Sequence, residues 1–96
     1  MGFSVSTEAA KWYQKELDLN PGDYVRFYIK LYGGIPTVHP SFYLGVSKGK
    51  EGEVDIRDIA NRIIFYFNKR DSWFLEEYDL SLGVENNVVS FHFREI

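Results

Sequence analysis

The fold is decided by residues 24–46, YVRFYIKLYGGIPTVHPSFYLGV. Residues 24–31 alternate between apolar side chains and polar or tyrosine side chains, the period of a half-buried strand. The apolar alternation returns at residues 42–46. Between the two runs lies Gly33-Gly34, which permits a sharp turn that other residues resist. The stretch therefore predicts two strands joined by a conformationally constrained loop.

The flanking segments extend this hairpin into a small mixed domain. From Thr7 to about Leu19 the apolar period is helical, with Ser6 as N-cap and Asn20-Pro21-Gly22-Asp23 as the stop. Residues 62–68 are apolar on both faces and predict a central strand covered on one side by the helix. The remaining predictions are strands at 3–5, 80–84 and 88–94, a helical turn at 73–75 and a tight turn at 85–87. Residues 54–56 and 59 form a short strand at most, and residues 47–53 form a solvated turn or mobile loop.

These elements predict an α+β fold. One long N-terminal helix and one short helix would pack on a mixed or antiparallel, curved β-sheet. A chain of 96 residues, 18% of them aromatic, suits one domain over residues 1–96, because aromatic side chains bury the most area.

Composition excludes several classes of function. The chain has no cysteine, which excludes disulfides, cysteine-ligated zinc and cysteine nucleophiles. The formal net charge is -3 and charges of both signs are interspersed, which argues against nucleic acid and membrane as partners. The first residues lack the basic and long apolar regions of a signal peptide, so we expect a cytoplasmic protein.

Two candidate binding features lie in the central loop. Gly33-Gly34 either allows positive φ for the turn or brings backbone N–H groups close to a ligand; its spacing favours the first reading. His39 could be a metal ligand with His92, but two histidines without a helical i, i+4 pair favour an ordinary loop imidazole. The sequence therefore predicts no metal site.

A third candidate is the second face of the first strand. Arg26, Tyr28 and Lys30, with Tyr43 from the return strand, form either a surface that binds an anionic ligand or partner chain, or a solvated face. Trp12, Trp73 and Phe74 are candidates for a dimer contact, with core packing as the alternative. No spacing of Ser, His, Asp or Glu selects a catalytic group, so we expect no enzymatic activity.

Several strings resemble the HesB/IscA-like family of iron–sulfur cluster biosynthesis, and in particular its cysteine-free, YneR-type bacterial branch. The matching strings are VSTEAAKWYQKELDL, YVRFYIKLYGGIP, SFYLGV, IIFYFNKRDSWFLEEYDLSLGV and VVSFHF, and the segment from Arg26 to Val46 is the most specific. The resemblance implies one domain with that family's fold over the whole chain.

The residues that hold a cluster in that family are missing here. Ile35 stands where the first cysteine would follow Gly-Gly, and the chain reaches Ile96 without the Cys-Gly-Cys of the cluster-binding members. The resemblance thus implies a degenerate, non-enzymatic protein without a cofactor. It would act through contacts with an unknown protein partner or as a homodimer. The alternative is a small-ligand or metal-binding protein that uses the loop from Gly33 to Pro40 with Arg26, Tyr28, Ile35, His39 and Tyr43.

Overall fold

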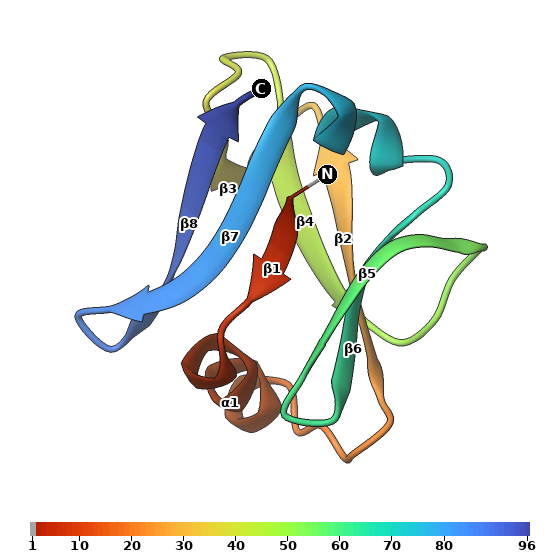
Figure 1. The fold of residues 1–96 in the computed structure, drawn as a ribbon, viewed down its shortest axis with the longest axis vertical. Coiled ribbons are helices and arrows are strands. Elements are labelled where there is room, and N and C mark those ends of the chain that lie inside the picture. The colour runs from red at the N-terminus through yellow and green to blue at the C-terminus, as the bar shows by residue number, and fades with distance from the viewer. Residues whose placement is uncertain (1) are drawn as a thin grey trace.

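Two β-sheets face each other across the core, and one helix closes one end of the space between them (Figure 1). The computed structural model describes residues 2–96. The larger sheet has the strand order β3-β4-β2-β6-β5, and the smaller has the order β1-β7-β8. The elements are β1 (Phe3–Val5), α1 (Thr7–Glu16), β2 (Tyr24–Lys30), β3 (Ile35–Pro36), β4 (Tyr43–Lys48), β5 (Val54–Ala60), β6 (Ile63–Asn68), the 3₁₀ helix η1 (Ser72–Glu76), β7 (Tyr78–Glu85) and β8 (Val88–Glu95).

The helix α1 begins as predicted and ends early. The Ser6 hydroxyl accepts a hydrogen bond from the Ala9 N–H at 3.0 Å and caps the first turn. The prediction of a long helix to Leu19 is wrong, because Asp18 takes a left-handed φ of 54° and turns the chain out of the helix after ten residues. Aspartate is one of the few residues other than glycine that adopt this left-handed conformation. No helix within residues 2–96 is long and apolar enough to cross a membrane.

The α+β prediction is wrong, since the chain is mostly strand and its strands form two sheets. The C-terminal hairpin does not extend the sheet built on β2. Instead, β7 pairs in parallel with β1, with Phe3 opposite Leu80 and Val5 opposite Leu82. The short helix η1 separates β6 from β7 and redirects the chain toward β1. The apolar face of this second sheet then lies opposite the first.

Most predicted strands are confirmed, and one was underestimated. β2 and β4 pair antiparallel from Val25 opposite Lys48 to Lys30 opposite Tyr43, which confirms the hairpin that organises the chain. Asn86 and Asn87 have φ values of 53° and 65° and close the β7–β8 hairpin, as their tolerance of positive φ predicts. Residues 54–60 form a full strand at the sheet edge, where alternate side chains are exposed. β6 lies beside this edge strand, and β2 holds the centre.

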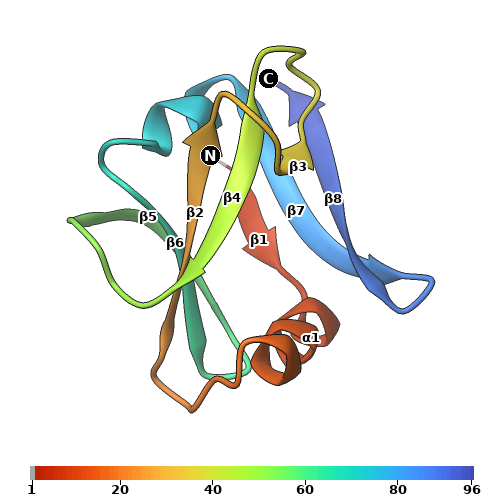
Figure 2. The same ribbon diagram turned by 180° about the vertical axis from the view of Figure 1, so that it is seen from behind.

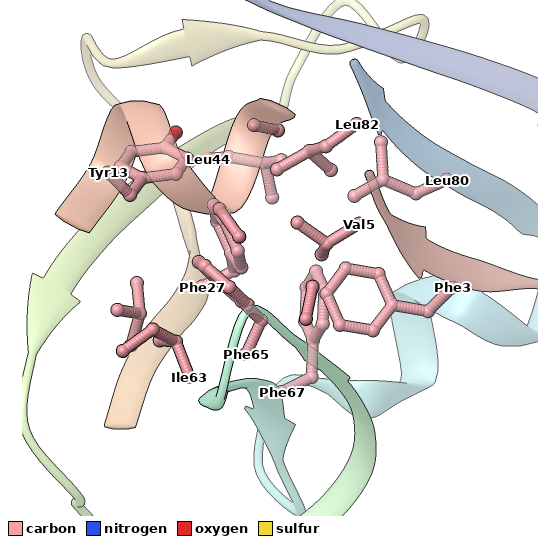
Figure 3. Close-up of a cluster of buried hydrophobic side chains, with 14 of the residues drawn as sticks. Phe3, Val5, Tyr13, Phe27, Leu44, Ile63, Phe65, Phe67, Leu80 and Leu82 are labelled. Atoms are coloured by element: carbon pink, nitrogen blue, oxygen red, sulfur yellow. The ribbon is translucent and has the colours of Figure 1, made fainter. Parts of the chain in front are cut away.

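Aromatic rings from both sheets and from α1 fill the core (Figure 3). Phe27 lies at its centre. Its ring centroid is 6.0 Å from that of Phe3 in the small sheet and 6.0 Å from that of Tyr13 in α1. Phe65 and Phe67 flank it on β6 at 6.3 and 6.0 Å. Such ring pairs add about 0.5–1.5 kcal/mol each beyond the area that they bury. Burial also raises the pKa of the Tyr13 hydroxyl, so this group stays protonated.

Candidate functional site

The structure divides the predicted site residues into two groups. Arg26, Tyr28 and Tyr43 lie on strands of the large sheet, on the face turned away from the core. Gly33, Gly34, Ile35 and His39 lie in the connection between β2 and β4. Figures 1 and 2 both place this connection at the end of the molecule opposite α1.

The glycine pair has a structural task, and at Gly34 only glycine fulfils it. Gly33 and Gly34 have φ values of 63° and 110°. A Cβ on Gly34 would lie 2.6 Å from the carbonyl oxygen of Leu44, so any side chain would push the connection away from β4. Ile35 then pairs with Leu44 and packs against the core. The structural reading of Gly33-Gly34 is confirmed.

His39 belongs to a short aromatic row that joins the connection to η1. Its ring centroid is 4.4 Å from that of Phe42, and the Phe42 ring is 5.4 Å from that of Trp73. The His39 Nδ1 accepts the Ser41 N–H at 3.1 Å. Thr37 steadies the loop further, since its hydroxyl donates to the Phe42 carbonyl oxygen at 2.8 Å. The loop from 37 to 42 is thus shaped by its own contacts.

Arg26 is buried and bound by two carboxylates. Its guanidinium lies 2.8 Å from the Asp71 carboxylate, which is also buried, and 2.5 Å from the carboxylate of Glu51. The same guanidinium stacks over the Tyr28 ring, 4.8 Å from its centroid. Asp71 also accepts the Ile29 N–H at 3.4 Å. Arg26 therefore links β2 to the segment before η1, a connecting role within the fold.

The segment from Ser47 to Glu53 covers Arg26. The Glu51 N–H donates to the Tyr66 hydroxyl at 2.6 Å, and the Asn68 side-chain amide donates to the Glu51 carbonyl oxygen at 3.2 Å. Tyr66 is fully buried beneath this segment. Residues 48–53 are exposed, which agrees with the predicted solvated turn, and these hydrogen bonds fasten the segment across the outer face of the sheet.

Tyr28 and Tyr43 complete that outer face. Tyr28 lies across Gly45, its cross-strand partner, and a Cβ at Gly45 would be 2.3 Å from the Tyr28 ring. Tyr43 pairs with Lys30 on one side and with Pro36 on the other. Both tyrosines are half-buried. A ligand at this face would have to compete with contacts that the chain already makes, and its existence stays a prediction.

Apolar side chains are exposed instead at the end formed by the β2–β4 connection and η1. Leu31, Tyr32, Val38 and Trp73 are 63%, 87%, 55% and 41% exposed, and we call them the apolar end. From Leu31 to Ser47 the chain has no Asp, Glu, Lys or Arg, although these make up 26% of its residues. Exposed apolar and aromatic side chains without charges among them are typical of the central part of a protein interface.

Sequence reasoning singled out Trp73 but missed Leu31, Tyr32 and Val38. The signal that could have found them is the long uncharged run, which includes two strand ends and a loop where charged residues are normally frequent. In the part of the chain that the structure describes, no three His, Asp or Glu side chains group as ligands for a metal ion. The arrangement at the apolar end suits recognition of another protein surface.

The comparisons with known proteins found two curated relatives. The pyruvate dehydrogenase inhibitor of Bacillus subtilis (strain 168) is 38% identical over 88 residues, which are 92% of this chain and 92% of the relative. An uncharacterised protein of Staphylococcus saprophyticus is 26% identical over 90 residues, with 92% of each chain covered. No family model and no solved structure matches the chain.

The assignment to the HesB/IscA-like family is therefore wrong. The relative that shares 38% of its aligned residues with this chain carries a different name, and the fold has two sheets instead of one helix-covered sheet. The strings that suggested the family follow α1 and most of the strands, but no family model matches the chain. The link to iron–sulfur cluster biosynthesis falls with this assignment.

Proposed function

The chain belongs to the family of the Bacillus subtilis pyruvate dehydrogenase inhibitor, and from this premise we propose that it inhibits a pyruvate dehydrogenase by binding to it. In this proposal the chain acts through protein contacts and performs no chemistry of its own. A cytoplasmic location is part of the proposal. The single observation that carries the binding mode is the apolar end.

The apolar end has the composition that protein recognition requires. Tyr32 is almost fully exposed and Trp73 is partly exposed. The segments that carry them, the β2–β4 connection and η1, lie at the same end of the molecule (Figure 2). Tyrosine and tryptophan are the residues on which interface binding energy most often depends. The absence of charge from Leu31 to Ser47 lowers the cost of removing water from this surface.

The apolar end is also well ordered for binding. The Thr37 hydroxyl accepts the His39 N–H at 3.1 Å, and the Gly34 turn is held against β4. A preformed loop loses less conformational freedom when it binds, which leaves more of the contact energy as affinity. The alternative, a small-ligand or metal site between Gly33 and Pro40, stays a prediction that no contact in residues 2–96 specifically favours.

The test is inhibition by the purified chain. Pyruvate-dependent formation of NADH by the pyruvate dehydrogenase of the same organism is measured while the chain is titrated into the assay, and binding is measured in parallel by surface plasmon resonance. We expect inhibition that saturates with the binding curve. No inhibition at a large molar excess of folded chain would refute the proposal.

A matched pair of variants tests whether the apolar end is the contact. Val38 and Ile59 are 55% and 57% exposed, and both are β-branched, but Ile59 lies on the edge strand β5, away from the apolar end. Val38→Glu should weaken binding about tenfold or more, as is usual for a charge placed in an interface core. Ile59→Glu should leave binding unchanged. Equal effects from the two substitutions would show that the contact lies elsewhere.

A further inference from the structure

The free edge of β8 differs from every other sheet edge of the described chain. β3 has only two residues, one of them Pro36, and β1 has only three. β5 contains a register shift between Val54 and Ile56 and presents charged side chains. Short length, proline, bulges and charge are the devices that keep sheet edges from pairing with other chains. β8 has eight residues, a regular register with β7, and neither proline nor lysine, and its charged residues Arg94 and Glu95 are confined to its last two positions.

The backbone of β8 offers an unused row of hydrogen-bonding groups. In β7, the backbones of Leu80 and Leu82 bond to the segment around β1, at 2.7 and 3.0 Å. Ser81 between them, and Asp79 and Gly83 on either side, must therefore turn their N–H and C=O groups toward β8, because these groups alternate along a strand. By the register of the pair, Val89, Phe91 and Phe93 direct their own groups to the free edge. This edge forms an outer margin of the molecule in both ribbon views (Figures 1 and 2).

The side chains of the same three residues are incompletely buried. Val89, Phe91 and Phe93 point to the core side of the sheet, where Phe91 touches Phe27 and Phe93 touches Phe74. All three are only partly buried at the margin, in contrast to the fully buried Phe27. Unpaired backbone groups and partly buried apolar side chains thus occur on the same residues.

We propose that two copies of the chain associate through β8, antiparallel about a two-fold axis, to form one continuous sheet from the two small sheets. The register that uses all three free residues places Phe91 opposite Phe91 of the second copy and Val89 opposite Phe93. Each of these pairs exchanges both backbone hydrogen bonds. An isologous contact of this kind closes on itself and stops at the dimer.

This register is also compatible with the side chains on the solvent face. It sets Ser90 opposite His92 and Val88 opposite Arg94, so no like charges face each other. On the core side it pairs aromatic and β-branched side chains, the cross-strand combination that stabilises sheets most. A second copy is the occupant that the sequence of β8 fits, because the strand is complementary to itself.

Association through β8 does not depend on the proposed inhibition. β8 runs toward the apolar end, since Ile96 and η1 lie near each other there. In an antiparallel pair, the apolar ends of the two copies would point in opposite directions and stay open. Failure of the dimer and failure of inhibition are therefore separate results.

Two substitutions of one exposed residue test the register. Val88 is 54% exposed and is the partner of Glu85 on β7 within the same copy. Val88→Arg would place a positive charge opposite Arg94 of the second copy, twice by symmetry, whereas it would gain Glu85 within its own copy. Val88→Glu reverses both effects. The dimer and the isolated chain therefore respond with opposite signs.

Sedimentation equilibrium of the full chain, over micromolar to near-millimolar concentrations, measures the dimer dissociation constant. We expect it to rise about two- to thirtyfold in Val88→Arg and to fall by a similar factor in Val88→Glu. Thermal melts at concentrations where the chain is monomeric should show the opposite order of stability. Val89→Pro removes a free-edge N–H without touching the bonds to β7, and it should also weaken the dimer. A chain that is monomeric throughout, or variants that shift the constant in the same direction, would overturn the proposal.

Discussion

The two ion pairs of Arg26 allow us to predict separately how burial and charge affect the free energy of unfolding. Arg26 contacts two carboxylates at similar distances, 2.8 Å to Asp71 and 2.5 Å to Glu51. The Asp71 side chain is 9% exposed and that of Glu51 is 71% exposed. The perturbations are Asp71→Asn and Glu51→Gln, each of which replaces the charged carboxylate by a neutral amide of nearly the same size.

The two substitutions should differ several-fold in their effect on the free energy of unfolding. Removing one partner of a buried pair costs about 3–5 kcal/mol, because it leaves the other charge buried without compensation. Glu51 still compensates part of the Arg26 charge, so we expect about 2–3 kcal/mol for Asp71→Asn. Exposed pairs contribute about 0–1 kcal/mol, and Glu51→Gln should stay in that range.

The assay is urea unfolding followed by circular dichroism and tryptophan fluorescence. For a chain of this size, a loss of 2–3 kcal/mol lowers the urea midpoint by roughly 1–2 M and the melting temperature by roughly 10–20 °C. A double-mutant cycle with Arg26→Met should give a larger coupling energy with Asp71 than with Glu51. Equal losses from Asp71→Asn and Glu51→Gln would refute the argument, because burial would then not decide the strength of the pair.

Two further predictions concern contacts on the outer faces of the sheets. Gly45→Ala should destabilise the fold by about 1–3 kcal/mol, because its Cβ would meet the Tyr28 ring at 2.3 Å, and Tyr28→Ala in the same chain should recover part of this loss in urea unfolding. The hydrogen bond from Arg94 lowers the pKa of Asp79, so the ionised carboxylate stabilises the fold at neutral pH, and this contribution is lost as the pH falls through the lowered pKa. Asp79→Asn should thus be less stable than the parent chain at pH 7 and equally stable in strong acid; a stability difference that persists unchanged in acid would contradict this.

Local features of the fold could be predicted because short-range physics determines them. The alternation from Val25 to Ile29 identifies β2, and the tolerance of Asn86 and Asn87 for positive φ identifies the last hairpin. The start of α1 at Ser6 follows from its capping bond. Each of these signals lies within a few residues of the structure that it specifies.

Strand partners could not be predicted, because pairing depends on residues far apart in the chain. Phe3 and Leu80 are opposite each other in β1 and β7, yet nothing near either of them indicates this partner. A hairpin-length connection makes an antiparallel neighbour the natural expectation, and η1 provides a different route. The single curved sheet that was predicted is the result of joining neighbouring strands in sequence order.

The same limit applies to the exposure of the predicted site residues. Arg26 and Tyr28 are predicted as site residues because charged and aromatic side chains alternate on a strand face, but the carboxylates of Glu51 and Asp71 pair with the Arg26 guanidinium. The sequence does not indicate that Val38 is exposed, because an apolar residue in a loop is normally expected to pack in the core. Exposure is a property of the finished arrangement: Arg26 is buried in an ion pair with Asp71, whereas Val38 is 55% exposed.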